Sequence, residues 1–304
     1  MVQTITVVDT TKPLITCPAN ITVECTASTD PSATGTATGS DTCGNVAISH
    51  TDAFAPGCGN TGVITRTWKA TDDCGNFETC VQTITVVDTT KPSIACPANT
   101  IVECTGDTTP ATQGFATGSD TCGNVAISHT DAFAPGCGNT GVITRTWKAT
   151  DDCGNFATCV QTISVVDTTK PSITCPANTT VECTSDTTPA TQGSATGSDT
   201  CGNVTISHTD AFAPGCGNSG IITRTWKATD GCGNFATCIQ TITIVDTTAP
   251  TISDVPDATV ECTGSTDASA TGTASGSDTC GTVTTTHSDG PMSDQCGNLS
   301  LIHI

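Results

Sequence analysis

The chain repeats itself with a fixed period of 79 residues. The segment Val7–Pro13 returns as Val86–Pro92, as Val165–Pro171 and, with small changes, as Ile244–Pro250. Copies this long and this similar indicate that one small domain has been duplicated head to tail. A unit of this length lies at the lower end of what a single hydrophobic core stabilises. We therefore expect the function to come from a row of equal units.

The period also sets the domain boundaries. We predict a first repeat at 10–88, a second at 89–167, a third at 168–246 and a partial fourth at 247–304. Residues 1–9 match the last strand of a repeat, because 2–8 copy 81–87, so we expect the body of a preceding repeat to be missing. The segment 299–304 departs from the repeat pattern and resembles a translated adapter end from a sequencing library. We interpret it as an artefact.

Cysteines are the most regular feature of each repeat. The chain has 21 cysteines but no tyrosine and only three tryptophans, so covalent links are expected to supplement a thin core. Six cysteines at fixed spacing predict disulfides, and hence an extracellular location. A metal site is the alternative, but the intervals are mostly 8 to 18 residues and no CxxC pair occurs. The predicted disulfide cysteines are Cys17, Cys25, Cys43, Cys58, Cys74 and Cys80, then Cys96, Cys104, Cys122, Cys137, Cys153 and Cys159, then Cys175, Cys183, Cys201, Cys216, Cys232 and Cys238.

Charge excludes one class of partner. The formal net charge is −20 with only nine basic residues, so no basic face exists for nucleic acid. Charged residues make up only 12% of the chain, which predicts a surface rich in Thr, Ser, Asn and Gly. Besides a match at Asn298, which adjoins the segment that we interpret as an artefact, three N-glycosylation sequons lie in such segments, and glycans are candidate partners. The acceptors are Asn20, Asn178 and Asn203.

Apolar residues alternate with a period of two, and no segment sustains a helical period. This pattern predicts an all-β fold of tandem immunoglobulin-like antiparallel β-sandwiches. Trp68 is expected in the core on the same face as Ile64 and Ala70, with Arg66 over its ring near the sheet rim. The predicted strands of the first repeat are 14–17, 20–25, 33–38, 46–52, 62–71 and 77–87.

Several motifs together resemble the hyalin repeat (HYR) domain, in a cysteine-rich form. They are Asp-Thr-Thr-Lys-Pro-x-Ile-x-Cys-Pro-Ala-Asn-x-Thr-Val-Glu from residue 9, Ser-Asp-Thr-Cys-Gly from residue 40, Ala-Thr-Asp-Asp-Cys-Gly-Asn from residue 70 and Cys-x-x-Thr-Ile-Thr-Val-Val-Asp from residue 80. The resemblance implies immunoglobulin-like sandwiches in extracellular adhesion, matrix or surface-fibre proteins, without catalysis. It also implies that Cys17 pairs with Cys80.

The remaining four cysteines are assigned from the poles of the sandwich. Cys43 and Cys74 lie in similar Asp-x-Cys-Gly turns, which an immunoglobulin-like topology places at one end, and Cys25 and Cys58 then lie near the other. The predicted pairs are 25–58 and 43–74, with equivalents in the later repeats. A map showing 17–25 or 74–80 would contradict this set.

Successive repeats are joined without a flexible spacer. Only Asp88 to Pro92 separates the last strand of one repeat from the next, which predicts a stiff, extended rod. The same topology brings aspartates together at each junction, where Ca²⁺ is a candidate ligand. In the alternative, which we favour, each aspartate caps its own turn. The three sets are Asp9, Asp41 and Asp72, then Asp88, Asp120 and Asp151, then Asp167, Asp199 and Asp230.

Two functions fit these features. The first is an extracellular structural fibre of disulfide-stapled repeats, with neighbouring repeats, further copies of the chain and glycans as partners. The second is a cell-surface adhesion or ligand-binding stalk. We expect no enzyme and no required cofactor, because no Ser/His/Asp or Cys/His set recurs with suitable motifs. No membrane-spanning run occurs in the sequence.

Overall fold

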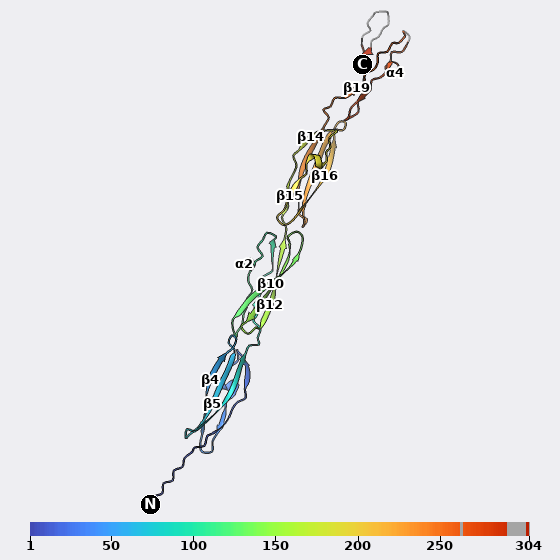
Figure 1. Cartoon of the computed structure of the whole chain (residues 1–304). Coiled ribbons are helices and arrows are strands. Elements are labelled where there is room, and N and C mark those ends of the chain that lie inside the picture. Colours follow the sequence, from blue (N-terminus) through green and yellow to red (C-terminus); the bar gives the residue numbers. More distant parts are fainter. Residues whose placement is uncertain (262–263, 291–301, 304) are drawn as a thin grey trace. The chain divides into compact units, whose positions relative to one another are not determined.

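The computed structural model describes residues 1–261, 264–290 and 302–303 (Figure 1). Strands dominate it, and the helices described are single turns. The chain divides into two compact units, one of residues 1–136 with 140–166 and one of 137–139 with 167–304. Our expectation about 299–304 falls mostly outside the described residues. Only the backbone pairing of β21 (Ser288–Asp289) with β22 (Ile302–His303) is described there.

The first repeat is a sandwich of a four-stranded sheet and a two-stranded sheet. The large sheet has the order β2-β6-β5-β4, in which the last three strands are antiparallel and β2 runs parallel to β6. The small sheet pairs β1 with β3. The all-β, immunoglobulin-like prediction is confirmed. The strands are β1 (Leu14–Thr16), β2 (Ile21–Glu24), β3 (Thr38–Ser40), β4 (Val46–Pro56), β5 (Gly62–Asp72) and β6 (Phe77–Val87).

One predicted strand of this repeat is wrong. Much of the segment 33–38 lies outside any strand, because the chain first forms the helical turn α1 (Pro31–Thr34) and enters β3 only at Thr38. Pro31 opens the turn, where its missing N–H is not needed. Gly35 ends it with φ of 96°, a conformation that glycine adopts without strain. The local turn therefore overrides the alternating pattern.

The later repeats use the same elements. In the second repeat they are β7 (Ser93–Ala95), β8 (Thr100–Glu103), α2 (Pro110–Gln113), β9 (Thr117–Ser119), β10 (Val125–Pro135), β11 (Gly141–Asp151) and β12 (Phe156–Val166). In the third they are β13 (Ser172–Thr174), β14 (Thr179–Glu182), α3 (Pro189–Gln192), β15 (Thr196–Ser198), β16 (Val204–Pro214), β17 (Gly220–Asp230) and β18 (Phe235–Val245). The partial repeat has β19 (Thr251–Ile252), α4 (Ala268–Thr271) and β20 (Gly276–Ser277).

The core of each complete repeat is built around one tryptophan and one glutamine. In the first repeat Trp68 is 2% exposed and Gln82 is fully buried. Trp68 Nε1 donates to Gln82 Oε1 at 3.3 Å, and Gln82 Nε2 donates to the carbonyls of Ala19 and Thr34 at 3.0 and 2.7 Å. A buried amide is tolerated because its groups are satisfied. It ties β6 to the segments around α1.

Arg66 lies over the tryptophan ring, as predicted, with Cζ 5.8 Å from the ring centroid. We expected Arg66 near the rim of the sheet, but its side chain is buried. Burial is tolerated because the guanidinium charge is paired. Nε and Nη2 donate to the two carboxylate oxygens of Asp52 at 2.8 Å, and Nη1 donates to Thr34 Oγ1 at 2.9 Å. The hydrogen bonds from Arg66 lower the pKa of Asp52 below its ordinary value, although burial opposes the shift.

We expect Asp52→Asn to destabilise the first repeat by about 2–3 kcal/mol, because it leaves a buried guanidinium opposite a neutral amide. The loss falls at the low end for a buried pair since Asp52 is 36% exposed and water reaches it. Amide hydrogen exchange in β4 and β5 measures the effect. The same strands of the second and third repeats are controls within the chain, and faster exchange there as well would contradict a local role.

The pH dependence of this variant has a definite sign. The pKa of Asp52 is lowered in the folded protein, so its ionised form contributes stability above the ordinary value of 3.8. That contribution disappears as the pH falls through the lowered pKa. The exchange difference between wild type and Asp52→Asn should therefore shrink below about pH 4.

Candidate functional site at the repeat junction

Two similar turns of the second repeat face its boundary with the first. In one, Asp120 Oδ1 accepts the N–H of Cys122 at 2.7 Å. In the other, Asp151 Oδ1 accepts the N–H groups of Cys153 and Asn155, both at 2.9 Å. Aspartate stabilises such turns because its short side chain reaches the backbone two residues on. Each turn therefore fixes the position of one cysteine.

The facing end of the first repeat presents the other two cysteines. Cys25 follows β2, and its N–H donates to the carbonyl of Val87 at 2.8 Å. Cys58 lies in the tight loop between β4 and β5, where Thr61 Oγ1 donates to the Cys58 carbonyl at 2.6 Å. The N–H of Asn60 donates across the boundary to the carbonyl of Cys122 at 2.7 Å. The two repeats thus meet through backbone as well as side chains.

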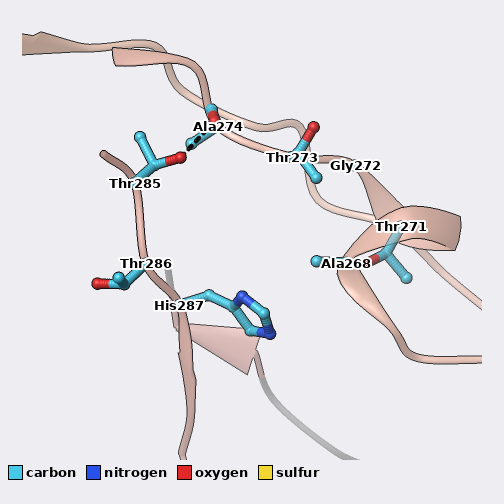
Figure 2. Close-up of a pocket in the computed structure, with 8 residues that line it drawn as sticks. All are labelled: Ala268, Thr271, Gly272, Thr273, Ala274, Thr285, Thr286 and His287. Atoms are coloured by element: carbon cyan, nitrogen blue, oxygen red, sulfur yellow. Dashed lines mark hydrogen bonds between the residues drawn. The ribbon is translucent and has the colours of Figure 1, made fainter. Parts of the chain in front are cut away.

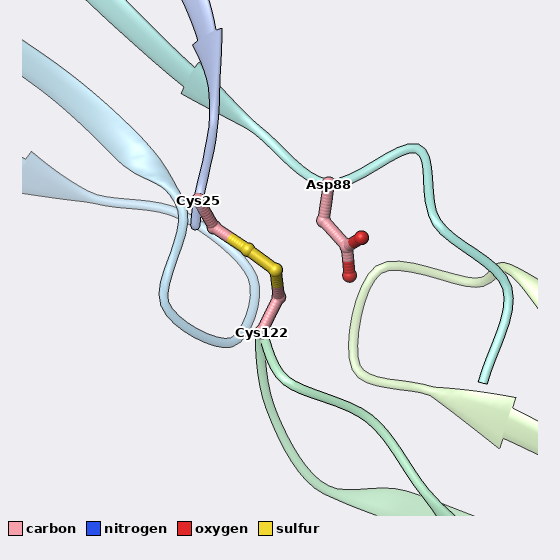
Figure 3. Close-up of side chains that lie close together, drawn as sticks. All are labelled: Cys25, Asp88 and Cys122. Carbon is pink, nitrogen blue, oxygen red and sulfur yellow. A yellow bond between two sulfur atoms is a disulfide. The ribbon is translucent and has the colours of Figure 1, made fainter. Parts of the chain in front are cut away.

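Two disulfides cross this boundary. Cys25 is bonded to Cys122, with Cα atoms 5.8 Å apart, as Figure 3 shows. Cys58 is bonded to Cys153, with Cα atoms 5.1 Å apart. The bonded residues are separated by 97 and 95 positions, more than one period of the repeat. Together with the peptide linkage, three covalent connections hold the second repeat to the first.

The predicted pairs 25–58 and 43–74 are therefore wrong, as are their equivalents in the second repeat. The assignment of cysteines to opposite ends of the sandwich agrees with the structure, but the bonds join neighbouring repeats and do not form within one repeat. Because the linker has no slack, the thiol nearest to Cys25 belongs to the next repeat. The signal was present in the sequence: opposite poles joined by a five-residue linker must meet.

The pairing of Cys17 with Cys80 agrees with the resemblance described above. Their Cα atoms are 5.9 Å apart, and the bond ties the chain after β1 to β6 in the large sheet. Cys96–Cys159 and Cys175–Cys238 repeat it. In the second unit, Cys137–Cys232 and Cys183–Cys280 repeat the two long-range bonds, which contradicts the predicted pairs 104–137, 183–216 and 201–232. Cys104 and Cys201 are also disulfide-bonded.

Among the described residues, Cys43, Cys74 and Cys216 are free and exposed. Desolvation and the carboxylates of Asp9, Asp72 and Asp73 raise the pKa of the Cys74 thiol. A raised pKa reduces the thiolate fraction at neutral pH, and the thiolate is the reactive form. The predicted bond between Cys43 and Cys74 is absent.

The nine predicted junction aspartates all cap turns. Each accepts a backbone N–H two residues further along through Oδ1, which is the hydrogen bond that turn capping requires. At the first of these sets, hydrogen bonds from Asn76 and Cys74 more than offset desolvation and lower the pKa of Asp72. The aspartates and their donors' residues are Asp9 (Thr11), Asp41 (Cys43), Asp72 (Cys74), Asp88 (Thr90), Asp120 (Cys122), Asp151 (Cys153), Asp167 (Thr169), Asp199 (Cys201) and Asp230 (Cys232).

The structure also brings three of these aspartates together. Asp88, Asp120 and Asp151 each offer a carboxylate oxygen, and these oxygens lie within 4.8 Å of one another. Asp9 and Asp41 form a similar group with Cys43. The predicted gathering of carboxylates is thus present at the boundary between the first two repeats, beside the Cys25–Cys122 bond.

The three predicted glycosylation acceptors are exposed. Asn20 and Asn178 accept the N–H groups of Thr83 and Thr241 through Oδ1, both at 2.8 Å. Asn203 immediately precedes β16. In all three positions the sequon lies on the surface of its repeat.

A shallow pocket lies in the partial repeat, and none of its lining residues belongs to the junction between the first two repeats. Ala268, Thr271 and His287 lie around it, and Thr285 Oγ1 donates to the Ala274 carbonyl at 3.3 Å (Figure 2). Its walls are small side chains with a single imidazole. We assign it no role.

No family model and no curated protein matches the chain. Solved structures that are similar include the extracellular cadherin domains 1–5 of Protocadherin Gamma B2, at 11% identity over 78% of this chain, with a TM-score of 0.30. Drosophila N-cadherin EC1-4 has 13% identity over 77% and a TM-score of 0.28, and mouse Cadherin-23 EC22-24 has 15% over 77% and 0.30. The chain covers 60%, 76% and 99% of these structures, respectively. Such values are too low to relate its function to theirs.

Disulfide mapping of the oxidised chain tests the junction directly. We expect Cys25→Ser to expose the thiol of Cys122, whereas within-repeat pairing would expose that of Cys58. Alkylation followed by mass spectrometry identifies the new thiol. Cys17→Ser is the matched control, because it should expose only Cys80.

Gly59, in the loop that carries Cys58, packs directly against the backbone of the second repeat. It has φ of 53°, and a Cβ there would overlap the Cys122 carbonyl oxygen. We expect Gly59→Ala to slow closure of the Cys58–Cys153 bond at least several-fold during oxidative refolding, measured by quenched thiol labelling. Gly75→Ala is the control, because φ is 90° but nothing lies within 4 Å. Equal slowing in both variants would show that backbone strain alone is responsible.

Proposed function

We propose that this chain is part of an extracellular structural fibre in which successive β-sandwiches are locked together by disulfides. The observation that carries the proposal is the pair of bonds across the junction, Cys25–Cys122 and Cys58–Cys153. A single peptide linker allows two domains to bend and twist. Two further covalent tethers from different points of the interface oppose both motions.

The bonds also form a continuous covalent path through the second repeat. Cys153, bonded to the first repeat, follows β11, and Cys137, bonded to Cys232, precedes it. β11 is a central strand with hydrogen-bonded neighbours on both sides. Of the 15 residues between the two cysteines, 11 are already extended in this strand. A pulling force transmitted along this path can therefore lengthen the chain only slightly.

Each bond also stabilises the folded chain. Closing a loop of about 100 residues contributes roughly 4–5 kcal/mol in the chain-entropy model. This matters because each repeat is small and its core has few aromatic residues. Durability supports a mechanical function better than a ligand-binding one, so we favour the fibre over an adhesion stalk.

The composition is consistent with an extracellular surface. Disulfides persist in oxidising compartments, and the exposed sequons at Asn20, Asn178 and Asn203 fit a glycan-decorated fibre. The resemblance to hyalin repeats supports the same location. Within the described part of the chain, no helix combines the length and apolarity that crossing a membrane requires.

Rigidity of the junction is the testable consequence. Thr51 in β4 and Thr130 in β10 are exposed equivalents in the two repeats, suitable for spin labels on non-natural amino acids. We expect one narrow distance distribution in the oxidised chain. Replacing Cys25, Cys58, Cys122 and Cys153 by serine should broaden it at least twofold, because only the linker then restrains the repeats.

The control variant is Cys17→Ser with Cys80→Ser, which removes a bond within the first repeat and leaves the junction intact. Its distribution should stay narrow. Equal widths for the oxidised chain and the junction variant would contradict a fibre stiffened by inter-repeat bonds.

A further inference from the structure

Three aspartates from both sides of the junction converge on one point. Asp88 follows β6, at the end of the first repeat. Asp120 begins the turn after β9, and Asp151 ends β11, both in the second repeat. One oxygen of each lies within 4.8 Å of the others. The three negative charges therefore gather where the two repeats are joined.

The most buried of the three has an unsatisfied oxygen. Asp151 is 6% exposed, and its Oδ2 is buried without a hydrogen-bond partner. The equivalent oxygen in the first repeat, Asp72 Oδ2, accepts Asn76 Nδ2 at 2.9 Å. Asn155 Nδ2 donates to the Asp88 carbonyl at 3.0 Å, as Asn76 Nδ2 does to the Asp9 carbonyl at 3.1 Å, but it makes no hydrogen bond to Asp151 Oδ2. A buried carboxylate oxygen without a partner is costly, so turn capping alone does not account for this site.

Protein groups near this point do not neutralise the charge. The ion pairs of the described residues join Lys12 to Glu78 and each buried arginine to the aspartate opposite it, and none includes the three junction aspartates. The Cys25–Cys122 disulfide, which lies beside Asp88, carries no charge (Figure 3). Carboxylates this close repel one another, and a bound cation reduces this repulsion more than the capping hydrogen bonds alone do.

We propose that Asp88, Asp120 and Asp151 bind one Ca²⁺ ion at the junction. Ca²⁺ takes oxygen ligands at about 2.3–2.6 Å, so two ligands of one ion lie at most about 5 Å apart, which the 4.8 Å limit satisfies. Mg²⁺ requires shorter bonds and a nearly ideal octahedron. Water completes the coordination. With three protein carboxylates, the expected Kd is roughly 10⁻⁴ to 10⁻³ M, the range of extracellular modules.

The ion would tie the linker of one repeat to both cysteine-bearing turns of the next. It would satisfy Asp151 Oδ2 and cancel repulsion that otherwise opposes docking. Asp167, Asp199 and Asp230 occupy the equivalent sequence positions in the second unit. The inference does not depend on the proposed fibre, because a bound ion stabilises a junction whatever its task.

Calorimetry on the oxidised full chain tests the site, using CaCl₂ after treatment with EDTA and MgCl₂ as the comparison. We expect Ca²⁺ to raise Tm by several degrees at 10 mM and Mg²⁺ to raise it much less. Asp151→Asn keeps an oxygen to cap its turn, removes one charge and should lower the Ca²⁺ stoichiometry by one. Asp88→Asn, in the linker, should also lower the Ca²⁺ stoichiometry by one. It replaces Asp151→Asn in the experiment if that variant does not fold.

Asp152→Asn is the charge-matched control. Asp152 adjoins Asp151, but its carboxylate accepts the N–H of Asn124 and is not one of the three proposed ligands. It should leave the stoichiometry unchanged. No Ca²⁺ binding by the wild-type chain, or equal losses in Asp151→Asn and Asp152→Asn, would overturn the site and leave only diffuse attraction of counterions. The spin-label distances measured in EDTA test the fibre proposal separately.

Discussion

The structure of this chain depends on the close abutment of its repeats. A five-residue linker that ends in proline leaves no room for a spacer, so the loops that carry Cys25 and Cys58 meet the two cysteine-bearing turns of the second repeat. The hydrogen bond from Asn60 to Cys122 and the two disulfides exist only because of this contact. In return, the bonds hold the contact in one arrangement. Neighbouring repeats thus stabilise one another covalently.

Inside each repeat, the core combines few apolar residues with polar groups that are individually satisfied. Gln82 bridges the tryptophan to two backbone carbonyls, and Arg66 is buried because Asp52 and Thr34 accept its hydrogen bonds. Such a core depends on geometry more than on buried area, since losing one partner leaves another group unsatisfied. The Cys17–Cys80 bond holds the two sheets in the positions that this network requires.

The Asp-x-Cys-Gly turns join covalent and electrostatic functions in four residues. In both turns of the second repeat the aspartate caps the backbone and positions the cysteine that bonds the first repeat. The same capping aspartates then place further carboxylate oxygens together beside the linker. A turn selected for a disulfide therefore also creates a point of concentrated negative charge. The oxidised junction and its acidic cluster are products of one local structure.

The sequence by itself determined the repeat, the all-β fold, the turns and the disulfide chemistry, because these depend on local periodicity and on residue types. It also separated the cysteines correctly into two poles. Only the tertiary structure decided that Cys25 reaches Cys122 instead of Cys58, since pairing depends on distances between repeats. The burial of Asp151 Oδ2 and the helical turn at Pro31 likewise arise from packing and local geometry that an alternating pattern does not contain.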